Sequence, residues 1–155
     1  MLHRLFRPRA TGASSMSELL HRIKVFVFQV QGPDPRYLLL RGAQGIESTW
    51  GPIQGNLGFG EQLETAIQRE VMDDTGILRP LDLIDLQMPQ LTIVGDEEVI
   101  EWAYGLKTAP VKEPLKLDPR WADFRWTGFS QGYPLLEFET DRAAFMRLHT
   151  LVRAA

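Results

Sequence analysis

Three acidic side chains near the middle of the chain have the types and the spacing to hold a metal ion. Glu70, Asp73 and Asp74 stand at positions i, i+3 and i+4 of a segment with helical periodicity, so their carboxylates share one face. Like charges this close destabilise an isolated helix unless a positive group lies between them. Mg²⁺ is a natural candidate, because it takes carboxylate oxygens and keeps waters and substrate phosphates in its shell. The three acids alone leave a second interpretation open, a solvated acidic helix face.

Residues in front of this cluster extend it. Glu61 lies nine residues before Glu70, so on a continuous helix it falls near the same side, two and a half turns earlier. Arg69 is placed to pair with one of the acids or with a phosphate group. Three glycines then predict a tight loop before the helix, where the backbone bends sharply or approaches a ligand: Gly55, Gly58 and Gly60.

An amphipathic helix must position these acids. Apolar residues recur at helical spacing between Glu61 and Asp74, and Gly76 follows as a suitable C-terminal stop, so we predict a helix over Glu61–Asp74. A second helix is predicted over Asp141–Val152 at the end of the chain. Between and before them, β-branched and aromatic runs predict six strands: Ile23–Phe28, Tyr37–Arg41, Leu81–Met88, Leu91–Val94, Val99–Leu106 and Phe124–Trp126. This order predicts an α+β fold, with a mixed β-sheet sandwiched between α-helices.

The bulk properties limit the class of partner. A chain of 155 residues fits one domain with one substantial core, and we expect this domain to span 18–155 after a mobile basic tail at 1–17. The formal net charge of −3 gives no reason to expect a nucleic-acid polymer or an anionic membrane as partner. With no cysteine, thiolate metal sites and cysteine nucleophiles are excluded. The apolar runs are too short to span a bilayer and no signal peptide is visible, so a cytoplasmic location is the default expectation.

The spacing of the candidate residues resembles a known family motif. The chain has a glycine, five residues, a glutamate, seven residues, then Arg-Glu-Val, one residue, Asp-Asp, one residue and Gly-Ile, which together run from Gly55 to Ile77. This pattern is similar to the 23-residue Nudix box, and a match of this length by chance is rare. The resemblance implies a Nudix-type pyrophosphohydrolase that uses Mg²⁺, or alternatively Mn²⁺, on a nucleotide-like small molecule containing a diphosphate.

The resemblance also implies roles for single residues. Glu70 and Asp74 would be the main metal ligands, with Asp73 assisting, while the backbone at Gly55 would lie beside the metal. Glu61 would support the metal shell and Arg69 would orient Glu70. The expected mechanism is attack of water on phosphorus, assisted by the metal, without a side-chain nucleophile.

Two positions depart from the family pattern. The family usually has Glu-Glu where this chain has Asp73-Asp74, and each aspartate is one methylene shorter. It also usually has a glutamate at the position of Gly58. Because metal sites depend sharply on ligand placement, a catalytically weakened domain that binds a nucleotide as a sensor or interaction module is the alternative function.

Motifs outside the box are similar to the branch that hydrolyses nucleoside triphosphates and dihydroneopterin triphosphate. They include an apolar run ending in Arg41 and a tryptophan, Trp50, five residues before the box glycine. Arg41, Trp50 and Phe59 are therefore candidate substrate-binding residues. That branch commonly has Glu-His where this chain has Arg120-Trp121. Specificity for ADP-ribose or diadenosine polyphosphates is an alternative, and relatives include both monomers and homodimers.

Overall fold

The computed structural model describes residues 19–43 and 49–154, so the tail expected at 1–17 lies outside the described residues. The strands of the described chain are β1 (Leu20–Val30), β2 (Pro35–Gly42), β3 (Trp50–Gly51), β4 (Ile53–Asn56), β5 (Pro80–Asp85), β6 (Gln90–Val94), β7 (Glu97–Thr108) and β8 (Trp121–Thr127). The helices are α1 (Leu63–Thr75), α2 (Phe129–Gly132), the 3₁₀ turn η3 (Tyr133–Leu135) and α3 (Glu139–Ala154).

Strand β1 is the centre of one mixed sheet. It pairs in parallel with β7 along most of its length, from Leu20 opposite Val99 to Phe28 opposite Lys107. Its other edge is shared, because β4 pairs antiparallel with the first half of β1 and β2 pairs antiparallel with its end. The remaining strands extend the sheet in antiparallel pairs, with β3 and β8 on β2 and with β5 and β6 on β7.

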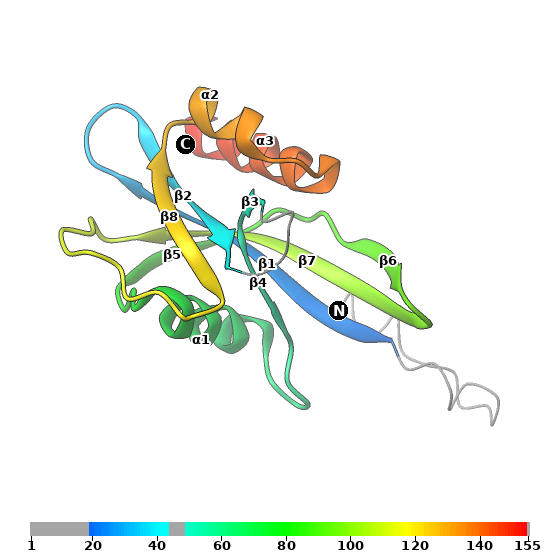
Figure 1. Ribbon diagram of the computed structural model, residues 1–155. Coiled ribbons are helices and arrows are strands. Elements are labelled where there is room, and N and C mark those ends of the chain that lie inside the picture. The colour runs from blue at the N-terminus through cyan, green and yellow to red at the C-terminus, as the bar shows by residue number, and fades with distance from the viewer. Residues whose placement is uncertain (1–18, 44–48, 155) are drawn as a thin grey trace.

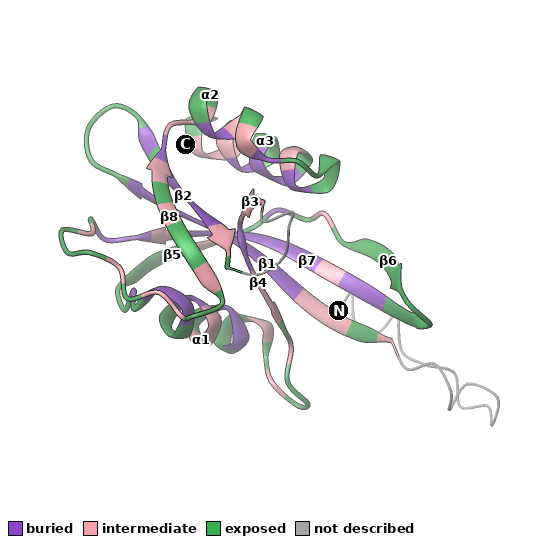
Figure 2. Cartoon of the chain, in the orientation of Figure 1, coloured by how far each residue is buried: buried purple, intermediate pink, exposed green. Residues whose placement is uncertain are grey.

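Helices cover both faces of this sheet, and each face has its own apolar core. Alternate residues of β1 point to opposite sides: Ile23 packs with Ile67 of α1, whereas Phe26 packs with Phe145 of α3. Figure 1 shows α1 on one side of the sheet and α2 with α3 on the other, and Figure 2 shows that long stretches of β1, β2 and β7, between these layers, are buried. The predicted sheet between helices is therefore confirmed.

The observed boundaries differ from the predicted ones where local capping decides them. Helix α1 begins at Leu63, so Glu61 precedes it instead of lying on it, and Gln62 at the N-cap is extended. At the other end Gly76 has the left-handed conformation that stops the helix, as predicted, and its N–H donates to the carbonyl of Met72 at 2.8 Å. The short elements β3, β4, α2 and η3 were not predicted, because they are too brief to show a hydrophobic period.

A buried charged group joins the sheet to the start of α3. Lys24 on β1 is only 3% exposed, and its Nζ lies 2.6 Å from Asp141 Oδ1 and 3.0 Å from Glu101 Oε1. Burial raises the pKa of the Asp141 carboxyl, while the ammonium of Lys24 opposes that shift. Both partners of Lys24 are close enough to compensate the buried charge, so this group fixes α3 against the sheet. None of the helices in the described ranges is long and apolar enough to cross a membrane.

The side chain of His149 on α3 should make stability depend on pH. It stacks on Phe129, with ring centroids 4.2 Å apart, and its Nδ1 lies 2.7 Å from the hydroxyl of buried Tyr37. Burial, and then the charge of Arg153, hold the pKa of His149 below its ordinary value of 6.5. In the window between the folded pKa and 6.5 the unfolded chain binds more protons, so the folded state loses stability as the pH falls.

We therefore expect the free energy of unfolding to fall between about pH 7.5 and about pH 5.5. The variant His149→Gln should show a shallower dependence over the same range, because this titration is removed. Urea denaturation at a series of pH values measures both slopes. Equal slopes in the two proteins would show that His149 does not contribute to the pH dependence.

Candidate active site

The loop between β4 and α1 is closed by an ion pair. Arg69 Nε lies 2.8 Å and its Nη2 lies 3.0 Å from the two carboxylate oxygens of Glu61, a bidentate contact. The N–H of Gly58 donates to the same carboxylate at 2.9 Å, and Arg69 also donates to the carbonyl of Asn56. The hydrogen bond from Arg69, and then that from Gly58, holds the pKa of Glu61 below its ordinary range. Glu61 therefore serves to fasten the glycine loop to the helix.

Glu70 lies against the backbone of β4. A Cβ atom on Gly55 would overlap the Glu70 side chain, with Cγ of Glu70 only 2.7 Å away, so this approach requires glycine. The Glu70 side chain is 14% exposed, and Arg69 Nη1 lies 3.5 Å from its Oε1. Burial raises the pKa of Glu70, the nearby Asp74 adds to the rise, and the guanidinium groups of Arg120 and Arg69 oppose it. The carboxylate is thus held in place by one arginine of its own helix.

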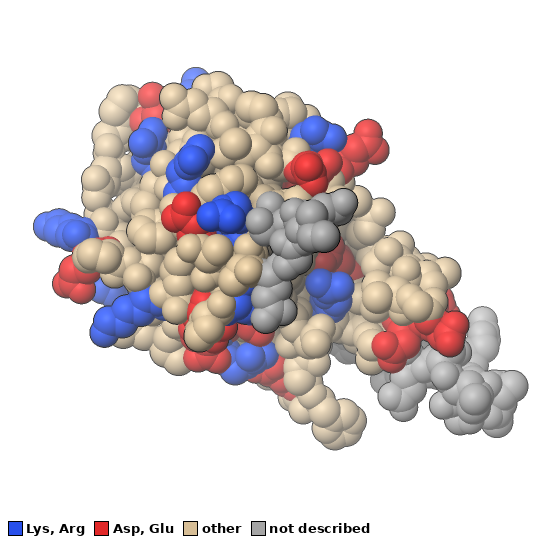
Figure 3. All heavy atoms as spheres, in the orientation of Figure 1, with Lys and Arg blue, Asp and Glu red and all other residues tan. Residues whose placement is uncertain are grey.

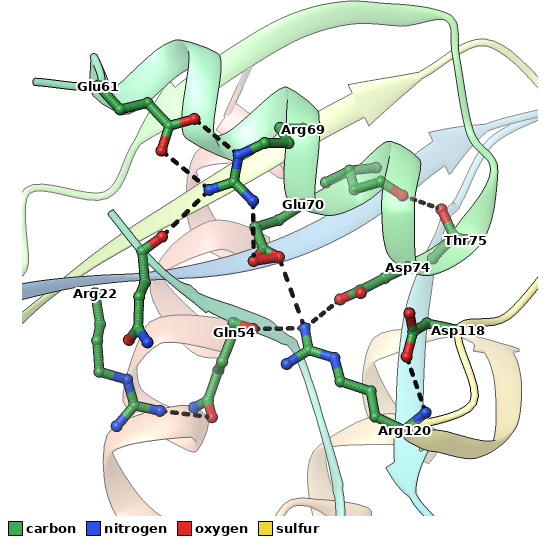
Figure 4. Close-up of polar contacts among 11 residues, drawn as sticks. Arg22, Gln54, Glu61, Arg69, Glu70, Asp74, Thr75, Asp118 and Arg120 are labelled. Atoms are coloured by element: carbon green, nitrogen blue, oxygen red, sulfur yellow. Dashed lines mark hydrogen bonds and ion pairs between the residues drawn. The ribbon is translucent and has the colours of Figure 1, made fainter. Parts of the chain in front are cut away.

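Three oxygen atoms converge on one point beside Glu70. The Nη2 atom of Arg120 forms an ion pair with Asp74, lies 2.6 Å from the carbonyl oxygen of Gln54, and lies 3.9 Å from Glu70 Oε2. Asp74 is buried, with 3% exposed. Figure 4 shows these groups, which come from β4, from α1 and from the loop before β8, pointing toward one another. Neither Gln54 nor Arg120 was among the predicted site residues.

The loop that carries Arg120 is fastened to the end of α1. The backbone N–H groups of Lys116 and Asp118 donate to the carbonyls of Thr75 and Asp74, at 3.0 and 2.9 Å. These bonds satisfy carbonyls that the end of a helix leaves without partners. The carboxylate of Asp118 in turn accepts from the N–H of Arg120 at 3.0 Å. These bonds therefore place the backbone of Arg120 beside the end of α1, from where its side chain reaches Asp74.

These residues line a pocket of about 540 Å³ that opens to solvent. Its walls are Arg22, Gln54, Gly55, Asn56, Arg69, Glu70, Arg120 and Trp121. Charges of both signs are mixed over the face of the molecule in Figure 3, without a large patch of one sign. A small anion bound together with a cation suits such a pocket better than an extended polyanion does.

The structure separates the predicted site residues into two groups. Glu61, Arg69, Glu70, Asp74 and Gly55 lie together, whereas the side chain of Asp73 is exposed and has no part in the convergence. The three predicted substrate-binding residues do not line the pocket. Phe59 is fully exposed at the tip of the glycine loop. Trp50 lies under two guanidinium groups, with those of Arg41 and Arg125 at 5.7 and 5.0 Å from its ring centroid.

The donor set fits a hard divalent cation. Two carboxylates and one carbonyl point at a single position, and Mg²⁺ in proteins is often bound by only one or two carboxylates, with waters and substrate phosphates completing its shell. Within residues 19–43 and 49–154 there is no group of three or more acids, histidines or cysteines arranged to hold an ion. Among the described residues, the two carboxylates and the carbonyl thus form only part of a metal shell, and waters or a ligand would supply the rest. The carbonyl beside the carboxylates is that of Gln54, one residue before the predicted Gly55.

Comparison with known proteins agrees with this architecture. Residues 20–149 match the sequence model of the NUDIX domain. A Listeria monocytogenes protein described as a NUDIX hydrolase superimposes with a TM-score of 0.74 at 13% identity, covering 86% of this chain and 94% of that one. The dihydroneopterin triphosphate pyrophosphohydrolase of Escherichia coli has a TM-score of 0.70 at 18% identity, over 84% and 94%. The NUDIX domain of Shewanella oneidensis NrtR, solved with ADP-ribose, has a TM-score of 0.71 at 11% identity, over 92% and 94%.

One curated protein also matches part of the sequence. An N-acetyl-D-glucosamine kinase from Dictyostelium discoideum is 35% identical over 81 residues. The matched stretch is 50% of this chain but only 25% of the kinase, so this chain spans a small part of that protein. The three solved structures described above, at 11% to 18% identity, share the fold with this chain.

The contact between Gly55 and Glu70 gives a direct test of the site geometry. In Gly55→Ala the new methyl group would push the Glu70 carboxylate out of place, and we expect a loss of about 1–3 kcal/mol in the free energy of unfolding. Gly42→Ala, at the end of β2 in the same sheet, is the matched control, since a Cβ there meets no atom within 4 Å. Urea denaturation measures both. Equal stability of the two variants would contradict the close packing described above.

Proposed function

This chain belongs to the NUDIX domain family, and we propose that it hydrolyses a nucleoside triphosphate-like substrate to a monophosphate and pyrophosphate with the help of a divalent metal ion. Family membership over residues 20–149 confirms the family predicted from the sequence, and with it the enzyme class of Nudix-type hydrolases. The substrate, the metal and the roles of individual residues are the proposal.

The observation that carries this proposal is the convergence of Glu70, Asp74 and the Gln54 carbonyl on one cation position in an open pocket. We assign these three groups as the protein's ligands for Mg²⁺ or Mn²⁺. A bound divalent ion supplies charge neutralisation on the phosphate oxygens and lowers the pKa of a coordinated water. Asp73 is exposed on the same helix, and the assisting role expected for it stays part of the proposal.

The surrounding residues orient these ligands. Glu61 fixes Arg69 through two hydrogen bonds, and Arg69 in turn contacts Glu70 at 3.5 Å, so the glycine loop and the helix acid are held as one unit. The pocket also presents the guanidinium groups of Arg22 and Arg120, which suit the negative oxygens of a diphosphate. In this proposal the same pocket positions the acids that bind the metal and presents the arginines that bind the phosphate groups of the substrate.

The proposal of a nucleotide-like substrate is supported by the sequence motifs and by the ligands named for structurally similar proteins. The similar structures include a dihydroneopterin triphosphate pyrophosphohydrolase and a domain in complex with ADP-ribose, so their shape alone does not select a substrate. Arg41 and Trp50 remain proposed contacts for the base or sugar, because both are partly exposed and stack on each other near β3. Phe59 would take part only if the glycine loop folds over a bound ligand.

One observation favours the alternative of a nucleotide-binding module. Arg120 is paired with Asp74, the residue that we assign as a metal ligand, and the site lacks a third acid side chain among the described residues. Tight binding of a nucleotide without metal-dependent turnover would support this second function.

The test is hydrolysis of a panel of nucleoside triphosphates, dihydroneopterin triphosphate, ADP-ribose and diadenosine polyphosphates. Pyrophosphate release reports on the triphosphates, and chromatographic detection of the nucleotide products, such as AMP, reports on ADP-ribose and the diadenosine polyphosphates. Each assay is run with Mg²⁺, with Mn²⁺ and with a chelator. We expect turnover of one class that the chelator abolishes. The variant Glu70→Gln should lower this turnover more than about a hundredfold, because it removes a charged metal ligand.

Glu64→Gln is the matched control for that variant. It makes the same change on the same helix, but Glu64 is exposed and lies outside the pocket, so turnover should stay close to that of the unmodified chain. Full turnover in Glu70→Gln would disprove the assignment of Glu70. Absence of turnover across the panel, from protein shown to be folded, would leave the binding module as the better function.

A further inference from the structure

The guanidinium group of Arg120 lies where the oxygen donors of the pocket meet. Its Nη2 contacts the carboxylate of Asp74 and the carbonyl of Gln54, the latter at 2.6 Å, and lies within 4 Å of Glu70. These are the same three oxygens that we assign to a divalent ion. Two cations repel each other at such a separation, so the guanidinium and a metal ion exclude one another from this position.

The acids of the site are shielded from solvent, whereas the side chain of Arg120 is partly exposed. The side chains of Asp74 and Glu70 are 4% and 14% exposed, whereas that of Arg120 is 43% exposed. The backbone of Arg120 is held by the carboxylate of Asp118, and its carbonyl accepts from the N–H of Ala43 at 2.8 Å. A rotation of the long side chain is therefore enough to vacate the cation position, with no movement of the loop.

The contacts of Arg120 differ from those of an ordinary surface pair. Arg153 and Asp34 form such a pair, with side chains 60% and 73% exposed and one contact at 3.5 Å. Arg120 instead joins acceptors from two different elements, and its guanidinium also lies over the ring of Trp121, 4.8 Å from the centroid. Without a positive group, Asp74 and Glu70 would face each other with little solvent to screen their repulsion.

We propose that Arg120 is an internal cation that holds the Glu70–Asp74 site in the absence of metal, that a divalent ion displaces it, and that the released guanidinium binds a phosphate group of the ligand. The first two parts concern metal binding alone. The third part rests on the proposed function, because it requires a ligand that carries a diphosphate. Arg120 thereby acts as a positioning residue in one state and as a phosphate contact in the other.

This exchange links the two ligands of the site. An ion that enters the pocket costs the chain its ion pair with Arg120, so the ion binds less tightly than the donors alone would allow. A phosphate group that accepts hydrogen bonds from the freed guanidinium compensates for the lost ion pair. The metal is therefore retained best when the substrate is present.

Titration calorimetry with Mn²⁺ on the full chain tests the displacement without any turnover. We expect Arg120→Gln to bind Mn²⁺ about tenfold more tightly than the unmodified chain, because no cation has to be displaced. Arg120→Lys keeps the charge but not the forked geometry, and its affinity should lie between the two. Both variants leave the backbone bonds of the loop in place.

Arg22→Gln is the matched control for this titration. Arg22 lines the same pocket, but its side chain donates to the side-chain carbonyl oxygen of Gln54 at 3.4 Å and is not paired with Glu70 or Asp74. It removes the same charge from the pocket, and we expect its Mn²⁺ affinity to rise only about twofold. An affinity in Arg120→Gln that is unchanged or weaker, or a rise of equal size in Arg22→Gln, would overturn the displacement.

Binding of inorganic pyrophosphate at saturating Mn²⁺ tests the second state. Here the expected direction is reversed, and Arg120→Gln should bind pyrophosphate about tenfold more weakly, because a charged hydrogen-bond donor is lost. Opposite changes in the affinities for metal and for pyrophosphate are not expected from a residue that only supports the fold. Unchanged pyrophosphate affinity would overturn the phosphate contact. Failure of the substrate panel, in contrast, would refute the proposed hydrolysis and leave both titrations valid.

Discussion

The repulsion between two carboxylates organises the candidate site. Glu70 and Asp74 lie one helical turn apart on α1, both shielded from solvent, and burial and mutual charge raise the pKa of Glu70. Each surrounding element either contributes a positive charge or leaves space for the carboxylates. Arg69 comes from the helix itself, Arg120 from the loop before β8, and β4 contributes a glycine that leaves room for Glu70. The pairing of β4 with β1 and the packing of α1 on the same sheet bring these contributions to one place.

Much of this arrangement could be predicted from the sequence because it depends on local periodicity. The helical spacing of Glu70 and Asp74, the stop at Gly76 and the glycines before the helix are all short-range signals. Glu61 was predicted on the helix but lies before it, because the hydrogen bonds of its carboxylate to Gly58 and Arg69 favour a closed loop. Although the backbone at Glu61 is not helical, its side chain still contacts Arg69, another residue of the motif.

The parts that the sequence did not predict come from tertiary contacts. Arg120 lies 46 residues beyond Asp74, and no spacing in the sequence joins the two. The available signal was indirect, since Arg120 stands where the similar branch commonly has an acid. The contact of the Gln54 carbonyl with Arg120 was not predicted, because a sequence shows which residue lacks a Cβ but not which carbonyl points inward. That the backbone of Gly55 lies beside the metal stays a prediction. The contacts of Arg41 and Arg125 with the ring of Trp50 were not predicted either, because they depend on the pairing of β2 with both β3 and β8. That Trp50 contacts a ligand stays a prediction.

The parallel pairing of β1 with β7 has a consequence for how the chain reaches this state. Every residue of β1 in that ladder is joined to a partner about eighty positions later, such as Ile23 with Trp102. Because the box lies between these two strands, the floor beneath α1 is incomplete until β7 has been synthesised and has closed a long loop. Contacts of such high sequence separation slow folding, since the entropy of loop closure is lost before the pairing compensates for it. During synthesis, the acid-bearing segment would therefore have only the β1, β2 and β4 part of its sheet until the second half of the chain has emerged.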